Sequence, residues 1–117
     1  MKKLLLITML AFAAATAVAA DKPQFPGGKA ELDQYIATHL IYPPQALANG
    51  IEGIVDVAFI VHTDGSIGTI KIVRMVDPDL ETEAIRLVKG MPAWIPAEKN
   101  GKPVDADAKV EINFELP

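Results

Sequence analysis

The segment IVDVAFIVHTDGSIGTIKIV, residues 54–73, contains the clearest structural signal in this chain of 117 residues. Its first half alternates apolar positions with a more mixed set, and this period of two is typical of a β-strand. Thr-Asp-Gly-Ser follows at residues 63–66, and Asp-Gly supplies the positive φ values that tight hairpin turns require. We therefore predict antiparallel strands at residues 54–62 and 67–76, with a bulge at Gly68 in the second.

Helical patterns flank this hairpin on both sides. Apolar residues recur at helical spacing in residues 29–40, and a short helix is predicted for residues 44–49 because Pro44 suits a first turn. A third helix begins at Asp77-Pro78-Asp79 and ends at Gly90, with an aspartate as its cap. A last strand at residues 108–116 completes the pattern. The fold class predicted is α+β: a two-layer sandwich with a small antiparallel sheet of about three strands and helices packed on one face.

The N-terminus reads as an export signal. Met1-Lys2-Lys3 is followed by an apolar run that ends in small residues at 17–20, the order typical of a signal peptide. We expect residues 1–20 to be the signal peptide, residues 21–28 a short lead-in, and residues 29–117 one domain. The alternative is an uncleaved inner-membrane anchor, which normally needs about 20 strongly apolar residues.

Composition narrows the classes of function. The chain has no cysteine, which excludes disulfides and thiolate metal sites. Beyond Lys2 and Lys3, nine basic residues face 15 acidic ones, so the exported part is acidic, and clustered phosphate contacts with nucleic acid are not expected. The sequence carries no nucleophile elbow, phosphate-binding loop or metal-ligand spacing around its two histidines. We expect no catalytic residues, no metal site and no cofactor.

A series of short motifs resembles the C-terminal domain of TonB energy transducers. The motifs are Tyr42-Pro43-Pro44-Gln45-Ala46, Gly50-Ile51-Glu52-Gly53, Val55-Asp56-Val57-Ala58-Phe59, Asp64-Gly65, Asp79-Leu80, Glu83-Ala84, Trp94, Pro96 and Ile112-Asn113-Phe114. Phe25-Pro26-Gly27-Gly28 and Asn100-Gly101-Lys102-Pro103-Val104 resemble the variant common in Bacteroidetes-type members. The resemblance spans nearly all of the chain after residue 20.

The resemblance implies a periplasmic module whose partner is an extended, TonB box-like segment of an outer-membrane TonB-dependent receptor. The segment would add as a strand to the edge of the sheet, which is a general mode of peptide recognition. By resemblance the receiving residues are those of the last strand together with a Tyr-Pro motif beside it: Tyr42, Pro43, Lys109, Val110, Glu111, Ile112, Asn113, Phe114 and Glu115. From the residues alone, Tyr42 is equally well explained as packing at a helix corner, and the last strand as an ordinary charged edge.

The chain departs from energy-transducing members in one respect. Such members carry a membrane anchor and a long proline-rich spacer, whereas about five residues separate Ala20 from the domain here, a reach of about 15–18 Å. We therefore expect a stand-alone periplasmic domain. Two alternatives stay open: a transducer tethered to the periplasmic side of the inner membrane, which touches the membrane only if residues 4–20 are retained, and a structural or inhibitory envelope domain. A homodimer through the sheet edge is a further alternative.

Overall fold

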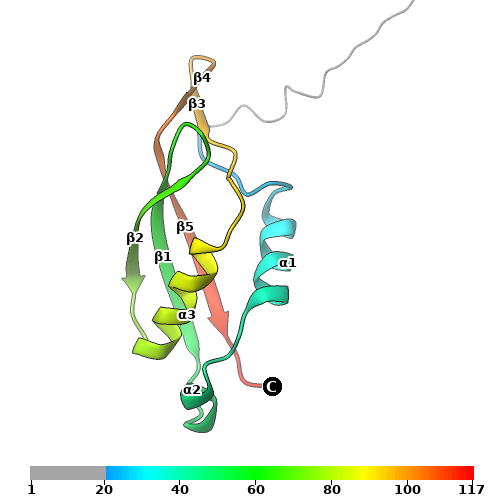
Figure 1. Ribbon diagram of the computed structural model, residues 1–117, viewed down its shortest axis with the longest axis vertical. Helices are drawn as coiled ribbons and strands as arrows, with labels where there is room; N and C mark the ends of the chain where they lie inside the picture. The colour runs from blue at the N-terminus through cyan, green and yellow to red at the C-terminus, as the bar shows by residue number, and fades with distance from the viewer. Residues whose placement is uncertain (1–20) are drawn as a thin grey trace, which may run out of the picture.

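A computed structural model describes residues 21–117, and the signal peptide expected at residues 1–20 lies outside the described residues. The chain forms one α+β domain (Figure 1). Its elements are α1 (Lys29–His39), α2 (Pro44–Ala48), β1 (Gly53–Val61), β2 (Ile67–Arg74), α3 (Pro78–Lys89), β3 (Ala97–Lys99), β4 (Lys102–Val104) and β5 (Ala106–Phe114).

The main sheet has three antiparallel strands in the order β2-β1-β5. β1 is central because it is the most apolar strand, with four side chains that are almost fully buried: Val55, Val57, Phe59 and Val61. β1 and β5 pair without interruption from Gly53↔Phe114 to Val61↔Ala106. The predicted fold class is thereby confirmed, and β2 and β5 are the two edges of this sheet.

The predicted hairpin turn joins β1 to β2. The N–H of His62 donates to the carbonyl of Ser66 at 2.9 Å, and Gly65 has a φ of 87°. The Asp64 carboxylate accepts hydrogen bonds from the backbone N–H of Ser66 at 2.9 Å and from its hydroxyl at 2.6 Å. These bonds hold the pKa of the Asp64 carboxyl below its usual value, because they favour the ionised form.

A bulge lies where Gly68 predicts one. The β1–β2 register passes from Phe59↔Ile70 to Val61↔Ile67, so β2 contributes one extra residue there, and a second shift lies between Asp56 and Val57. Bulges bend an edge strand and increase its twist. The β2 edge is therefore irregular, whereas the hydrogen-bond ladder that joins β5 to β1 is continuous.

The hydrophobic core lies between one face of the sheet and α3. Asp77 caps α3, since its carboxylate accepts from the N–H groups of Asp79 at 3.0 Å and Leu80 at 3.3 Å, and Pro78 occupies the first turn as predicted. The helix buries one stripe against the strands, formed by Leu80, Ala84, Leu87 and Val88. Trp94 is only 6% exposed and packs edge-on against Phe59, so it belongs to the core.

The first helix, α1, packs more loosely than α3 and lies alongside the β5 side of the sheet (Figure 1). None of its residues is buried. Its apolar face, predicted from the sequence, is only half-covered by the core and consists of Leu32, Tyr35, Ile36 and the following Leu40. This incomplete burial leaves apolar surface facing the edge of β5.

The observed boundaries differ from the predicted ones at the C-terminal strand. β5 spans Ala106–Phe114 rather than residues 108–116, because Ala106 still pairs with Val61 and the N–H of Leu116 donates to the Glu52 carboxylate at 2.7 Å. A second, two-stranded sheet of β3 and β4, joined by a turn at Asn100-Gly101, was not predicted.

Candidate functional site

The outer edge of β5 is the candidate site. Within residues 21–117, β5 pairs only with β1, so its other side carries unpaired backbone donors and acceptors. Its side chains alternate strictly. Val110, Ile112 and Phe114 are buried in the core, whereas Lys109, Glu111, Asn113 and Glu115 are exposed. The predicted contact residues of the last strand therefore divide into three that hold the strand in place and four that are accessible.

A groove runs between this edge and α1, which we call the α1–β5 groove. Leu32, Ile36 and Leu40 line it from the helix side, and residues 109–111, 113 and 115 line it from the strand side. Pro23, Gln24 and Phe25 of the lead-in border its end near Lys109. Strands in a sheet lie about 4.8 Å apart, so an added strand would run along this groove.

Backbone hydrogen bonds hold the lead-in in place at the end of the groove near Lys109. Gln24 and Ile95 exchange two hydrogen bonds of 2.9 and 2.7 Å, which form an isolated bridge. Phe25 then packs edge-on against Trp94 and in a tilted arrangement against Tyr35, with ring centroids 5.7 Å apart in both pairs. The end of the groove is therefore held by packing against the core.

Tyr42 lies beside the C-terminal end of β5, whereas Pro43 lies by α2 and α3, and neither residue lines the α1–β5 groove. The Tyr42 ring meets Phe114 edge-on at a centroid distance of 5.8 Å, and its hydroxyl donates to the carbonyl of Ile51. Burial, and more weakly the Glu52 carboxylate, raise the pKa of this hydroxyl, so it stays a donor at neutral pH. Pro43 is the N-cap residue of α2. In this structure both residues shape the corner after α1.

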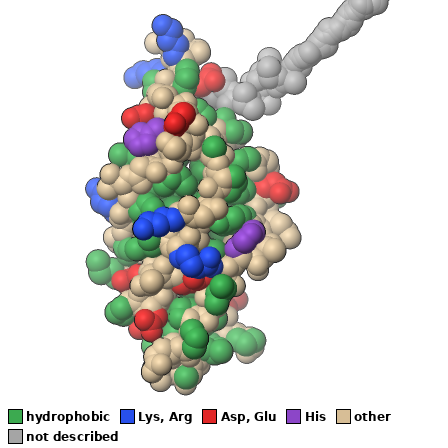
Figure 2. Space-filling view, in the orientation of Figure 1, with side chains coloured by type: hydrophobic (Ala, Val, Ile, Leu, Met, Phe, Trp, Pro, Cys, Tyr) green, Lys and Arg blue, Asp and Glu red, His purple; other side chains and the backbone are tan. Residues whose placement is uncertain are grey.

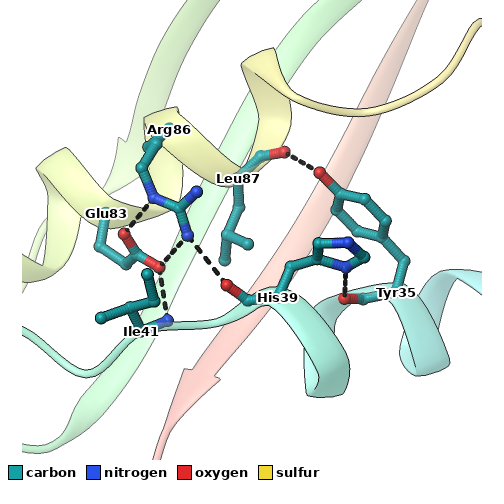
Figure 3. Close-up of polar contacts among 6 residues, drawn as sticks. All are labelled: Tyr35, His39, Ile41, Glu83, Arg86 and Leu87. Carbon is teal, nitrogen blue, oxygen red and sulfur yellow. Dashed lines mark hydrogen bonds and ion pairs between the residues drawn. The ribbon is translucent and has the colours of Figure 1, made fainter.

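A polar network attaches this corner to α3 (Figure 3). The Glu83 carboxylate, only 8% exposed, accepts the backbone N–H of Ile41 at 2.7 Å and two bonds from Arg86 at 2.7 and 2.8 Å. Arg86 also donates to the carbonyl of His39 at 2.9 Å. Burial alone would raise the pKa of the Glu83 carboxyl, but these bonds outweigh it and the pKa is lowered.

Tyr35 provides a second link between α1 and α3. Its hydroxyl donates to the carbonyl of Leu87 at 2.9 Å, and its ring stacks on His39 (Figure 3). The position of α1 beside β5 therefore depends on Tyr35, Glu83 and Arg86. The sequence marked α1 as amphipathic and Glu83 as a family motif residue, but gave no signal that these residues lie around one helix, because the partners are far apart along the chain.

Polar side chains outside this network form isolated contacts within the domain. Within the described part of the chain, no group of three His, Cys, Asp or Glu side chains is placed to hold a metal ion. His62 contacts the Asp105 carboxylate at 3.2 Å, and Ser66 donates to Asp64. The space-filling view shows charged side chains of both signs dispersed over the face of the molecule that is in view (Figure 2).

The fold and the edge together define a small α+β binding module. The family described as "Gram-negative bacterial TonB protein C-terminal" matches residues 38–116 of the chain. The chain therefore belongs to the TonB C-terminal domain family. This is a family of non-enzymatic energy-transducer domains that face the periplasm and act with TonB-dependent receptors.

Solved structures agree with this assignment. The chain is similar to the Helicobacter pylori TonB C-terminal domain (residues 194–285), with 27% identity, a TM-score of 0.59, and coverage of 74% of this chain and 91% of that one. It is also similar to the Pseudomonas aeruginosa TonB C-terminal domain, with 30% identity, a TM-score of 0.53, and coverage of 65% and 77%. No curated protein matches the chain. Among residues 21–117, no helix has both the length and the apolar character needed to cross a bilayer.

Proposed function

We propose that this protein is a periplasmic module that binds an extended segment of an outer-membrane TonB-dependent receptor by strand addition at β5, in support of energy-dependent transport. The observation that carries this proposal is the uncovered edge of β5 beside the α1–β5 groove. Unpaired N–H and C=O groups provide affinity in this mode of recognition, and neighbouring side chains provide register.

The regularity of the ladder favours β5 over the other edge. Nine consecutive residue pairs join β5 to β1 with no register shift, so the outward groups of β5 are evenly arranged for a new strand. The β2 edge has two register shifts against the same central strand. Bulges of this kind commonly protect an edge from pairing.

The N-terminus determines the form in which the module would act. Cleavage after Ala19 or Ala20 gives a stand-alone periplasmic domain, the form we favour, and retention of the apolar segment gives a tethered transducer. The motifs around Gly28 and Asn100 resemble those of Bacteroidetes-type members of the family, and this resemblance supports a TonB-dependent receptor as the partner. A purely structural or inhibitory role, with the edge closed by a second copy, is the remaining alternative.

Site-specific crosslinking in cells tests the proposal. A photoreactive residue replaces Glu111 on β5 in one strain and Thr69 on β2 in a control strain; both positions are exposed. We expect receptor segments to be captured from position 111 and not from position 69. Capture of the same receptors from both positions, or of another copy of this chain from position 111, would contradict strand addition to β5 by a receptor.

A further inference from the structure

The accessible side chains of β5 carry an ordered pattern of charge. Lys109, Glu111 and Asn113 of β5, and Glu115 directly after its end, all lie exposed away from the core, in the order basic, acidic, neutral, acidic. Asp33 of α1 also lines the groove, but its carboxylate is paired with Lys29 at 3.0 Å. The half of the groove that lies farther from the lead-in therefore takes its acidic character from Glu111 and Glu115, and among residues 21–117 no Lys or Arg lines it.

A buried carboxylate lies next to Glu111 on the neighbouring strand β1. Asp56 of β1 is the register partner of Glu111, and register partners in a sheet point to the same face. Asp56 is 8% exposed, and its Oδ1 atom is buried with no hydrogen-bond partner among the described residues. On its other side Asp56 is the register partner of Arg74 of β2, so it lies between an acidic and a basic residue and does not line the groove.

The opposite wall of the groove selects for apolar side chains. Leu32, Ile36 and Leu40 follow one face of α1 and are only half-buried in the absence of a bound segment. In a strand added to β5, successive side chains would alternate between this wall and the charged face. Burial of apolar side chains against α1 would complete the helix face that the core leaves open.

We propose that the α1–β5 groove selects extended segments with apolar residues at alternate positions and basic residues opposite Glu111 and Glu115. This inference rests on the proposed function and specifies the chemistry of the segment. Cross-strand neighbours on one face lie about 5 Å apart, close enough for ion pairs between opposite charges. An acidic residue at either place would instead meet like charge from Glu111 or Glu115.

Nuclear magnetic resonance titration of the intact chain, as recovered from cells, tests the inference with synthetic peptides. The probe is the capped pentapeptide KVTVK, whose symmetric pattern presents Lys opposite both glutamates in either strand direction. Two peptides are compared with it: EVTVE, which reverses the charge, and KVVTK, which breaks the alternation of apolar and polar residues. At low salt we expect KVTVK to shift the β5 amides and to bind roughly tenfold more tightly than EVTVE, and KVVTK to bind more weakly than KVTVK.

Charge variants locate the source of the preference. Replacing Glu111→Gln together with Glu115→Gln should reduce the preference for KVTVK over EVTVE to roughly threefold or less. Both side chains are exposed, so folding should not change. The control Asp79→Asn with Glu98→Gln removes the same net charge outside the groove and should leave the preference intact.

The outcomes separate the inference from the proposed function. Equal binding of both charged peptides at β5, or a preference for EVTVE, would overturn the charge selectivity and leave strand addition standing. Equal binding of KVTVK and KVVTK would overturn the role of the α1 wall. Shifts confined to β2, or no binding by any peptide, would overturn the inference and the proposed function together.

Discussion

The ring of Tyr42 meets the ring of Phe114 edge-on, with centroids 5.8 Å apart and planes at 88°. This contact joins the corner after α1 to the last residue of β5. Tyr42 of the Tyr-Pro motif, which the family resemblance places beside the receptor segment, therefore supports the end of β5 from within. Its effect on binding would act through Phe114 and the position of the strand.

Two substitutions at Tyr42 distinguish support from direct contact. Tyr42→Phe removes only the bond to the Ile51 carbonyl and should cost about 1 kcal/mol of stability. Tyr42→Ala also removes the packing on Phe114 and should cost about 2–3 kcal/mol. Urea unfolding measures both values. If Tyr42→Phe abolished segment binding at unchanged stability, the hydroxyl would contact the segment itself.

Proline substitutions in β5 test which backbone groups bind the segment. Ile112→Pro and Asn113→Pro each delete one N–H, and successive N–H groups point to opposite sides of a strand. One variant should lose a bond to β1 and be destabilised. The other should keep its fold and lose segment binding, because proline is tolerated where the donor faces outward from an edge.

Circular dichroism and peptide titration on both proline variants give the readout. The folded variant is the informative one, since it retains the strand and lacks an outward donor. Undiminished binding by that variant would exclude the β5 edge as the receiving surface. Unfolding of both variants would contradict the single unpaired side that the sheet order assigns to β5.

Glu83→Gln should weaken the attachment of α1 and flatten the pH dependence of stability. The folded state lowers the pKa of the Glu83 carboxyl below its ordinary value of 4.5, so its stabilisation is present above that pH and is lost as the pH falls through the lowered value. At neutral pH we expect a loss of roughly 2 kcal/mol. At about pH 2 the variant and the parent should differ much less. An equal difference at both pH values would show that the charge of Glu83 does not matter.

Gly65→Ala should be far more destabilising than Gly101→Ala. Both glycines have positive φ, 87° and 77°, which costs an alanine about 1–2 kcal/mol. A Cβ at Gly65 would also lie 2.3 Å from the carbonyl oxygen of Trp94, whereas nothing lies within 4 Å of one at Gly101. Thermal unfolding of the two variants compares them directly. Similar melting temperatures would mean that the loop around Trp94 yields readily.

Mass spectrometry of the protein recovered from cells tests the fate of the N-terminus. A product that begins near Asp21 is expected if the signal peptide is cleaved. Retention of residues 4–20, with the protein found in the inner-membrane fraction, would favour the tethered transducer instead.

The sequence by itself determined the class of fold and most of the elements. Alternation in residues 54–62, the Asp64-Gly65 turn and an aspartate cap at Asp77 or Asp79, of which the structure uses Asp77, are local signals, and each acts within a few residues of its own position. The structure confirms all three. The family resemblance rests on the same local motifs, and the match over residues 38–116 confirms it.

Only the tertiary structure decided which side chains and which helix lie beside the outer edge of β5. The sequence assigned the apolar face of α1 to the core, but Glu83, Arg86 and Tyr35 hold the helix beside β5, with that face half-open. The pairing of Asp56 with Glu111 on one side and with Arg74 on the other likewise depends on strand register. Such contacts join residues far apart along the chain, and local periodicity carries no information about which distant partners will meet.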